Sequence, residues 1–114
     1  MTGTRINGLL KALKQADAFL AVSIVNVRYM TGFTGSSGYA IISGKGNWFI
    51  TDFRYAEQAE QEVKTGYDIV VENRRGPDAI AAVCKRLGLK TIAFEESLSY
   101  GFTMGLTAKG LRIQ

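Results

Sequence analysis

Two short β-rich runs face each other across a glycine turn near the middle of the chain. Residues 39–43 read Tyr-Ala-Ile-Ile-Ser, residues 47–51 read Asn-Trp-Phe-Ile-Thr, and Gly44-Lys45-Gly46 separates the two runs. β-branched and aromatic residues suit the pleated, half-buried surface of a strand, and glycine suits the turn between strands. The pattern predicts a β-hairpin, which fixes two neighbouring antiparallel strands in any sheet the chain forms.

The hairpin lies inside a longer stretch, residues 26–58, that joins a turn-rich loop, the hairpin and the start of a helix. Asp52 follows the second strand and is well placed to cap a helix over residues 53–64. Loops at the ends of rigid elements are where function usually resides. The polar and aromatic groups gathered at element ends are Asn26, Arg28, Tyr29, Thr31, Asp52, Arg54 and Tyr55.

The rest of the chain alternates between helical and strand patterns. Residues 18–25 form a mainly apolar run, interrupted only by Ser23, as expected for a central strand. Pro77 and Asp78 open a helix that Gly88 ends. The order predicts an α/β fold with a mixed sheet of about five strands and helices on both faces. The remaining predicted elements are a helix over 6–13, strands over 67–71 and 91–94, a helix over 97–108, and a strand beginning at Leu111.

Glycines at 32, 35 and 38 punctuate the loop before the hairpin. Glycine allows backbone angles that other residues avoid, and it lets the chain approach another group closely. The spacing superficially suggests a phosphate-binding loop. No Lys-Ser/Thr pair follows, however, and a strand rather than a helix comes next, so no helix N-terminus is available for an anion. The glycines therefore indicate a tight connection.

Composition excludes several classes of function. The chain has no histidine and one cysteine, so the usual zinc site cannot be assembled and an internal disulfide cannot form. The net charge of +4 is spread along the chain, without the basic stripe of a nucleic-acid surface. The apolar run 18–25 is too short to span a membrane, and no signal peptide is evident. We expect one cytoplasmic domain, with Cys84 buried as a small hydrophobe.

Two motifs resemble the N-terminal domain of the creatinase/prolidase/aminopeptidase P family of metallopeptidases. The first is NVRYMTGFTGSSG, residues 26–38, and the second is FITDFRYAEQ, residues 49–58. Bacterial Xaa-Pro aminopeptidases and dipeptidases carry a similar loop, usually with Leu where this chain has Met30. The resemblance covers essentially all 114 residues, although the later strands are generic.

The resemblance implies a ribonuclease H-like α/β domain that is not itself catalytic. Members of the family cleave before proline with two divalent metals, such as manganese or cobalt, held by a separate C-terminal domain that these 114 residues lack. The N-terminal domain of such enzymes helps form homodimers and covers the mouth of the active site, which favours short proline-containing peptides. By this resemblance Asn26, Arg28 and Tyr29 could face that opening, with Arg28 available to a substrate carboxylate.

The same residues also have structural interpretations. Asn26 could end the strand, Tyr29 could bury its ring, and Arg28 could simply be solvated. Asp52 is expected to act as a cap and Arg54 as the partner of a carboxylate. The other motif residues expected to serve structure are Gly32, Gly35, Gly38 and Tyr55.

Two alternatives of a different class remain open. The chain could be a stand-alone module that holds a small anionic ligand through its glycine loop and Arg28. It could also be a dimerisation module without peptidase activity. The first predicts stabilisation by a ligand, and the second predicts a dimer that a substitution on one face dissociates.

Overall fold

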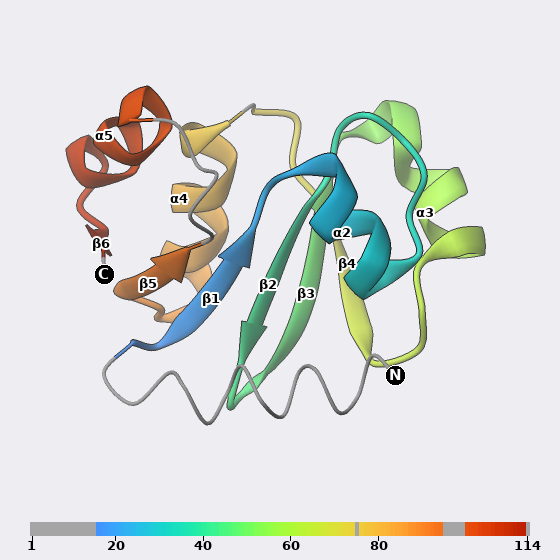
Figure 1. Cartoon of the computed structure of the whole chain (residues 1–114), viewed down its shortest axis with the longest axis horizontal. Coiled ribbons are helices and arrows are strands. Elements are labelled where there is room, and N and C mark those ends of the chain that lie inside the picture. Colours follow the sequence, from blue (N-terminus) through green and yellow to red (C-terminus); the bar gives the residue numbers. More distant parts are fainter. Residues whose placement is uncertain (1–15, 75, 95–99, 114) are drawn as a thin grey trace.

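The computed structural model describes residues 16–74, 76–94 and 100–113. Six strands form one sheet in the order β4-β3-β2-β1-β5-β6 (Figure 1). The strands are β1 Ala18–Ala21, β2 Tyr39–Ser43, β3 Gly46–Thr51, β4 Tyr67–Val71, β5 Thr91–Phe94 and β6 Arg112–Ile113. The helices are α2 Ile24–Thr31, the 3-10 turn η1 Phe53–Tyr55, α3 Ala56–Glu62, α4 Pro77–Leu87 and α5 Tyr100–Ala108.

The sheet is mixed because a single strand runs against its neighbours. β2 is antiparallel to both β1 and β3, whereas β1 pairs with β5, β3 with β4, and β5 with β6 in parallel. The predicted hairpin is therefore confirmed as β2–β3, with Ser43 opposite Gly46. The predicted α/β class and mixed sheet are also confirmed, and the sixth strand is the two-residue β6.

Successive side chains of each strand point to opposite faces of the sheet, where they pack into two separate hydrophobic cores. Leu20, Ile41 and Ile50 point to the face that α4 and α5 cover, and they are buried there with Ile80, Val83 and Leu106. Ala21, Ile42 and Phe49 point to the other face, where α2 and α3 contribute Val27, Met30 and Ala59. Each buried aliphatic or aromatic side chain of this size stabilises the fold by roughly 1.5–3 kcal/mol. Helices thus cover both faces, as the sequence predicts.

The helix α4 begins and ends where its sequence signals lie. Pro77 occupies its first turn, and Gly88 adopts φ 73° at its C-terminal cap. The Leu89 N–H donates to the Cys84 carbonyl at 2.9 Å, which satisfies one of the last carbonyls of the helix. Cys84 is buried as expected, and burial raises the pKa of its thiol to about 12.

The apolar run 18–25 is not one strand, and this prediction was wrong. β1 ends at Ala21, and Ser23 caps a new helix by accepting a hydrogen bond from the Asn26 N–H at 3.2 Å. The helix α2 ends at Gly32, whose φ of 86° suits glycine alone. Asn26 therefore lies in the first turn of α2 and does not end a strand.

One other boundary differs from the prediction, and two predicted helices lie partly or wholly outside the described residues. The helix after Asp52 consists of η1 followed by α3, and it stops at Glu62 rather than near Lys64. The helix predicted over 97–108 is described from Tyr100 onward, and residues 97–99 lie outside the described part. The helix predicted over 6–13 also lies outside the described residues.

Candidate functional site

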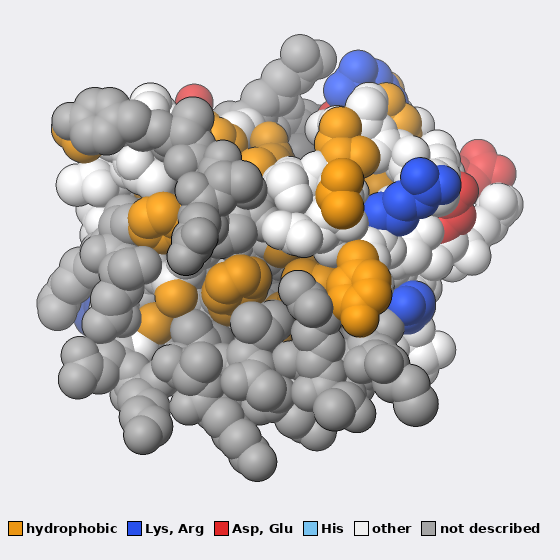
Figure 2. Space-filling model, viewed as in Figure 1, with side chains coloured by type: hydrophobic (Ala, Val, Ile, Leu, Met, Phe, Trp, Pro, Cys, Tyr) orange, Lys and Arg blue, Asp and Glu red, His pale blue; other side chains and the backbone are white. Residues whose placement is uncertain are grey.

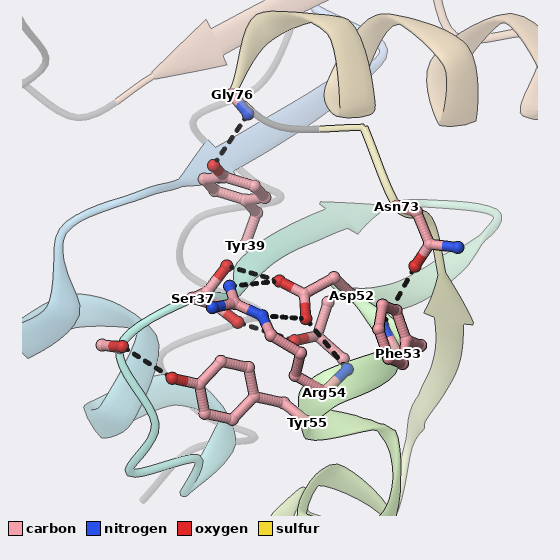
Figure 3. A network of polar contacts seen from close by, with 10 residues as sticks. Ser37, Tyr39, Asp52, Phe53, Arg54, Tyr55, Asn73 and Gly76 are labelled. Carbon is pink, nitrogen blue, oxygen red and sulfur yellow. Dashed lines mark hydrogen bonds and ion pairs between the residues drawn. The ribbon is translucent and has the colours of Figure 1, made fainter.

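The two sequence motifs meet at one edge of the sheet. Because β1, β3, β4 and β5 are mutually parallel, their carboxyl ends lie at the same edge, where the antiparallel β2 begins. Ser37, just before β2, therefore lies beside Asp52, just after β3. Asn73, after β4, reaches the same place and accepts a hydrogen bond from the Phe53 N–H at 3.1 Å (Figure 3).

Asp52 is the centre of the polar network at this edge. Its carboxylate accepts hydrogen bonds from Arg54 Nε at 2.9 Å and from Arg54 Nη2 at 2.8 Å (Figure 3). The Arg54 N–H donates to the same carboxylate at 3.0 Å, which is the expected N-cap interaction. The Arg54 hydrogen bonds, opposed only in part by burial, lower the pKa of Asp52 to about 2. Asp52 is thus a buried, ionised structural acceptor.

The glycine loop is attached to this network by side chains on both sides of Asp52. The Ser37 hydroxyl donates to the Asp52 carboxylate at 3.2 Å, and the Thr51 hydroxyl donates to the Ser37 carbonyl at 2.6 Å. The Ser36 and Tyr55 hydroxyls lie 2.9 Å apart. These bonds join the first motif to the second, so the pair of motifs forms one structural unit.

The three glycines serve two different needs. Gly32 requires a positive φ, whereas Gly35 and Gly38 do not. A Cβ atom on Gly38 would lie 2.4 Å from the Phe49 ring, and one on Gly35 would lie 2.4 Å from the Phe33 ring. These glycines allow the loop to pass directly over a packed pair of rings, whose centroids are 4.7 Å apart. The prediction of a tight connection agrees with this geometry.

Glu62 holds the other end of the loop, which the sequence did not predict. Its carboxylate accepts from the Thr34 N–H at 2.7 Å and from the Thr34 hydroxyl at 2.9 Å. Gln58, one turn earlier on α3, donates to Glu62 at 3.2 Å. The backbone hydrogen bond from Thr34 is the main reason that the pKa of Glu62 is lowered. Glu62 is therefore a half-buried anchor of the loop and not a freely solvated side chain.

Tyr55 supports the loop from the side of η1. Its ring packs edge-on against Phe33, with the centroids 5.8 Å apart, and the Arg54 guanidinium lies 5.2 Å from the centre of the Tyr55 ring. Such aromatic and cation–π contacts favour one arrangement of η1 against the loop. Tyr55 and Arg54 therefore both contact neighbouring side chains at the junction of the two motifs.

The three residues expected near a substrate opening all lie on α2. Arg28 and Tyr29 are exposed, and Asn26 is partly buried in the first turn. Val25 and Ile24 are beside them, with Val25 76% exposed. We call Ile24, Val25, Arg28 and Tyr29 the α2 face. Figure 2 shows hydrophobic side chains gathered over the helix on this side of the molecule, with basic side chains next to them.

A second exposed apolar group lies at the sheet edge. Phe53 is 70% exposed, although its backbone is fixed by Asn73. Val71 at the end of β4 is also exposed. Contiguous exposed apolar patches often mark a contact surface, whereas single exposed apolar side chains are common. The motif residues therefore divide into a buried structural network and an exposed apolar edge.

No group of three or more His, Cys, Asp or Glu side chains among the described residues is arranged to hold a metal ion. Asp52, the most deeply buried acid of the candidate site, already has its carboxylate occupied by Arg54 and Ser37. Residues 16–74, 76–94 and 100–113 thus do not fit a two-metal centre. Within those ranges, no helix has the length and hydrophobicity needed to span a bilayer.

The family model of the "Creatinase/Prolidase N-terminal domain" matches residues 5–112. The chain belongs to this family. Among relatives of this creatinase/prolidase N-terminal domain is the "Uncharacterized peptidase YqhT" of Bacillus subtilis, 48% identical over 86 residues. That match covers 75% of this chain but 24% of the relative, so the chain spans about a quarter of its length.

Solved structures agree with the family assignment. An Xaa-Pro dipeptidase from Bacillus anthracis superposes with a TM-score of 0.86 and 32% identity, over 99% of this chain and 33% of that one. An Xaa-Pro aminopeptidase P from Streptococcus thermophilus gives a TM-score of 0.81 and 28% identity, over 99% of this chain and 88% of that one. The creatinase/prolidase N-terminal fold is therefore shared with Xaa-Pro peptidases.

Proposed function

We propose that this chain is the non-catalytic N-terminal domain of a proline-specific metallopeptidase, an Xaa-Pro aminopeptidase or dipeptidase. The observation that carries the proposal is the family match over residues 5–112, together with the roughly threefold greater length of the Bacillus anthracis Xaa-Pro dipeptidase chain, of which this chain covers 33%. The described residues also lack a group suited to metal. The catalytic groups then belong to a C-terminal domain of the same polypeptide, which holds two divalent metal ions such as manganese or cobalt.

The domain contributes contacts rather than chemistry. The α2 face and Phe53 supply exposed apolar surface on rigid elements, which supports packing against the catalytic domain or a second subunit. In this proposal the enzyme is a cytoplasmic homodimer, and the domain limits access to the active site. Short proline-containing peptides pass, whereas longer chains are excluded.

Arg28 is the residue of the α2 face best suited to meet a substrate. Its guanidinium is exposed near the end of α2, and Glu62 lies close enough to interact with it electrostatically. A guanidinium can bind a carboxylate through two parallel hydrogen bonds. Arg28 would therefore favour peptides whose C-terminal carboxylate is near the opening, with Asn26 and Tyr29 beside it.

The proposal is tested with the complete enzyme encoded by the gene, a form lacking residues 1–114, and the 114-residue chain alone. Each is assayed with manganese on an Xaa-Pro dipeptide and on a peptide of about ten residues. We expect no turnover by the isolated chain, and a loss of the preference for short peptides when residues 1–114 are removed. Turnover by the isolated chain, or an unchanged preference without it, would contradict the proposal.

The variant Arg28→Ala in the complete enzyme distinguishes a role of Arg28 in substrate binding from a role in stabilising the fold. Because Arg28 is exposed, we expect an unchanged melting temperature and a raised KM with kcat little altered. Lys64→Ala, which removes an exposed positive charge from the segment after α3, is the matched control. If both variants changed KM equally, Arg28 would act only through its positive charge and would not bind the substrate carboxylate specifically.

A further inference from the structure

A cavity of about 490 Å³ lies along the outer side of α4, at the turn that joins α5 to β6. It shares no residue with the network around Asp52 or with the α2 face. Volumes of this size are typical of sites for small molecules. The cavity is open because Ala81, Ala82 and Gly88 line it with small groups, and a Cβ on Gly88 would meet no other atom within 4 Å.

The base of the cavity is apolar. Leu89 and Leu111 are buried there, and Cys84 lies among them with its thiol inaccessible to water. Ala81 and Ala82 of α4 are partly exposed on the wall. A ligand with a hydrocarbon body would remove this surface from water, at roughly 25 cal/mol per Å² of apolar area.

The rim of the cavity is basic. Arg74, Lys85, Lys90 and Lys109 line it, and among the described residues Asp78 is the one acidic side chain in the lining. Asp78 is already paired with Lys109, at 3.1 Å between Nζ and Oδ1. Two described acids contact residues of the rim: Glu72 pairs with Arg74 and Arg86, and Asp17 accepts from the Lys90 N–H.

Part of this positive charge has a structural explanation. Lys85 lies in the last turn of α4, and Lys109 directly follows α5, where cations offset the partial negative charge of a helix C-terminus. Within the part of the chain that the structure describes, the lining still carries four basic groups against one acid, around an apolar base that no described side chain fills. The combination is complementary to a molecule with one negative group and one apolar part.

We propose that this cavity binds a small organic anion with a hydrocarbon body, such as an aliphatic carboxylate. The apolar part lies against Ala82, Leu89 and Leu111, and the carboxylate lies at the rim beside Lys85 and Lys90. The ligand needs both its negative group and its hydrocarbon part to bind well. An inorganic anion leaves the apolar base of the cavity unfilled, and a neutral alkane leaves the basic side chains of the rim unpaired. The site is separate from the proposed peptidase role and does not depend on it.

The test is a titration of the ¹⁵N-labelled chain with hexanoate, followed by amide chemical shifts at low ionic strength. We expect saturable shifts of the Gly88, Leu89, Gly110 and Leu111 amides, with a Kd on the order of 1 mM for so small a ligand. Acetate, hexanol and hexylammonium are the matched probes for charge alone, hydrocarbon alone and the opposite charge. Each should bind about tenfold more weakly than hexanoate.

Two variants connect the shifts to this cavity. Ala82→Leu fills the groove with a good helix former and should abolish the shifts while the rest of the spectrum persists. The double variant Lys85→Gln/Lys90→Gln should weaken hexanoate about three- to tenfold, whereas Lys64→Gln, outside the cavity lining, should not. Equal binding of hexanol and hexanoate, shifts that survive in Ala82→Leu, or no shift at these amides would each overturn the proposal.

Discussion

The Asp52 carboxylate and the Arg54 guanidinium form a bidentate ion pair at the junction of β3 and η1, with N–O distances of 2.9 and 2.8 Å. The two residues are two positions apart in the sequence. The carboxylate side chain is 7% exposed and the guanidinium 48% exposed. The carboxylate of the pair is therefore buried, and its guanidinium is half exposed, just after the end of β3. The pair fixes the place where the strand turns into the helix, and it leaves Asp52 without a free oxygen for catalysis.

Replacing Arg54 with Ala should lower the melting temperature by several degrees. The change leaves the buried Asp52 carboxylate with the backbone N–H of residue 54 and the Ser37 hydroxyl as its remaining donors. Arg54→Lys keeps the charge but not the planar fork, so we expect an intermediate loss. Thermal unfolding followed by circular dichroism measures both, and an unchanged melting temperature in Arg54→Ala would show that the pair does not stabilise the fold.

The Asp52 pair should also make stability depend on acid pH. Its hydrogen bonds with Arg54 lower the pKa of Asp52 from 3.8 to about 2. A lowered pKa in the folded state stabilises the protein above the unfolded pKa, and this contribution is lost as the pH falls from about 4 towards 2. Urea unfolding at several pH values should show a smaller decrease over this range for Asp52→Asn than for the unsubstituted chain. Parallel curves for the two proteins would contradict the assignment.

The glycine loop predicts a graded series of substitutions. Gly38→Ala places a Cβ 2.4 Å from the buried Phe49 ring, so overpacking should cost about 1–3 kcal/mol in the free energy of unfolding. Gly32→Ala imposes a positive φ on alanine and should cost about 1–2 kcal/mol. Gly44→Ala is the control, because its Cβ meets nothing within 4 Å and should change stability by under about 0.5 kcal/mol. Denaturant unfolding gives the order, and equal values at all three positions would refute it.

Glu62 should protect the start of the glycine loop from opening. Its carboxylate accepts from the Thr34 N–H at 2.7 Å, so Glu62→Ala should accelerate hydrogen exchange at the Thr34 amide. Glu60→Ala removes an exposed carboxylate from the same helix and serves as the control. The measurement is exchange by NMR at constant pH. Unchanged exchange at Thr34, or an equal effect of both variants, would show that Glu62 does not anchor the loop.

Much of the fold follows from local sequence signals. The hairpin turn, the Pro77 and Gly88 boundaries of α4 and the Asp52 cap each depend on residues close together in the chain, and each was predicted. The family resemblance of residues 26–38 and 49–58 was confirmed by the family match. These features need no knowledge of long-range packing, which is why sequence alone indicates them.

The helix α2 and the contact between Glu62 and the glycine loop were not predicted from local sequence signals. Ile24 and Val25 are β-branched and continue an apolar run, so their pattern favours a strand even though the structure places them, exposed, on a helix. Ser23 followed by Gly32 is the pattern of a helix cap at each end and would have indicated α2. Glu62 binds Thr34 across 28 positions, and no local pattern reveals such a pair.

Our central proposal is that these residues form the N-terminal domain of a proline-specific metallopeptidase. The most direct measurement is the sequence of the gene downstream of the Gln114 codon. Our account predicts an open reading frame long enough for a catalytic domain, encoding a histidine together with paired aspartate and glutamate residues that can hold two metal ions. A stop codon immediately after Gln114 would contradict it and would make this chain a free-standing domain.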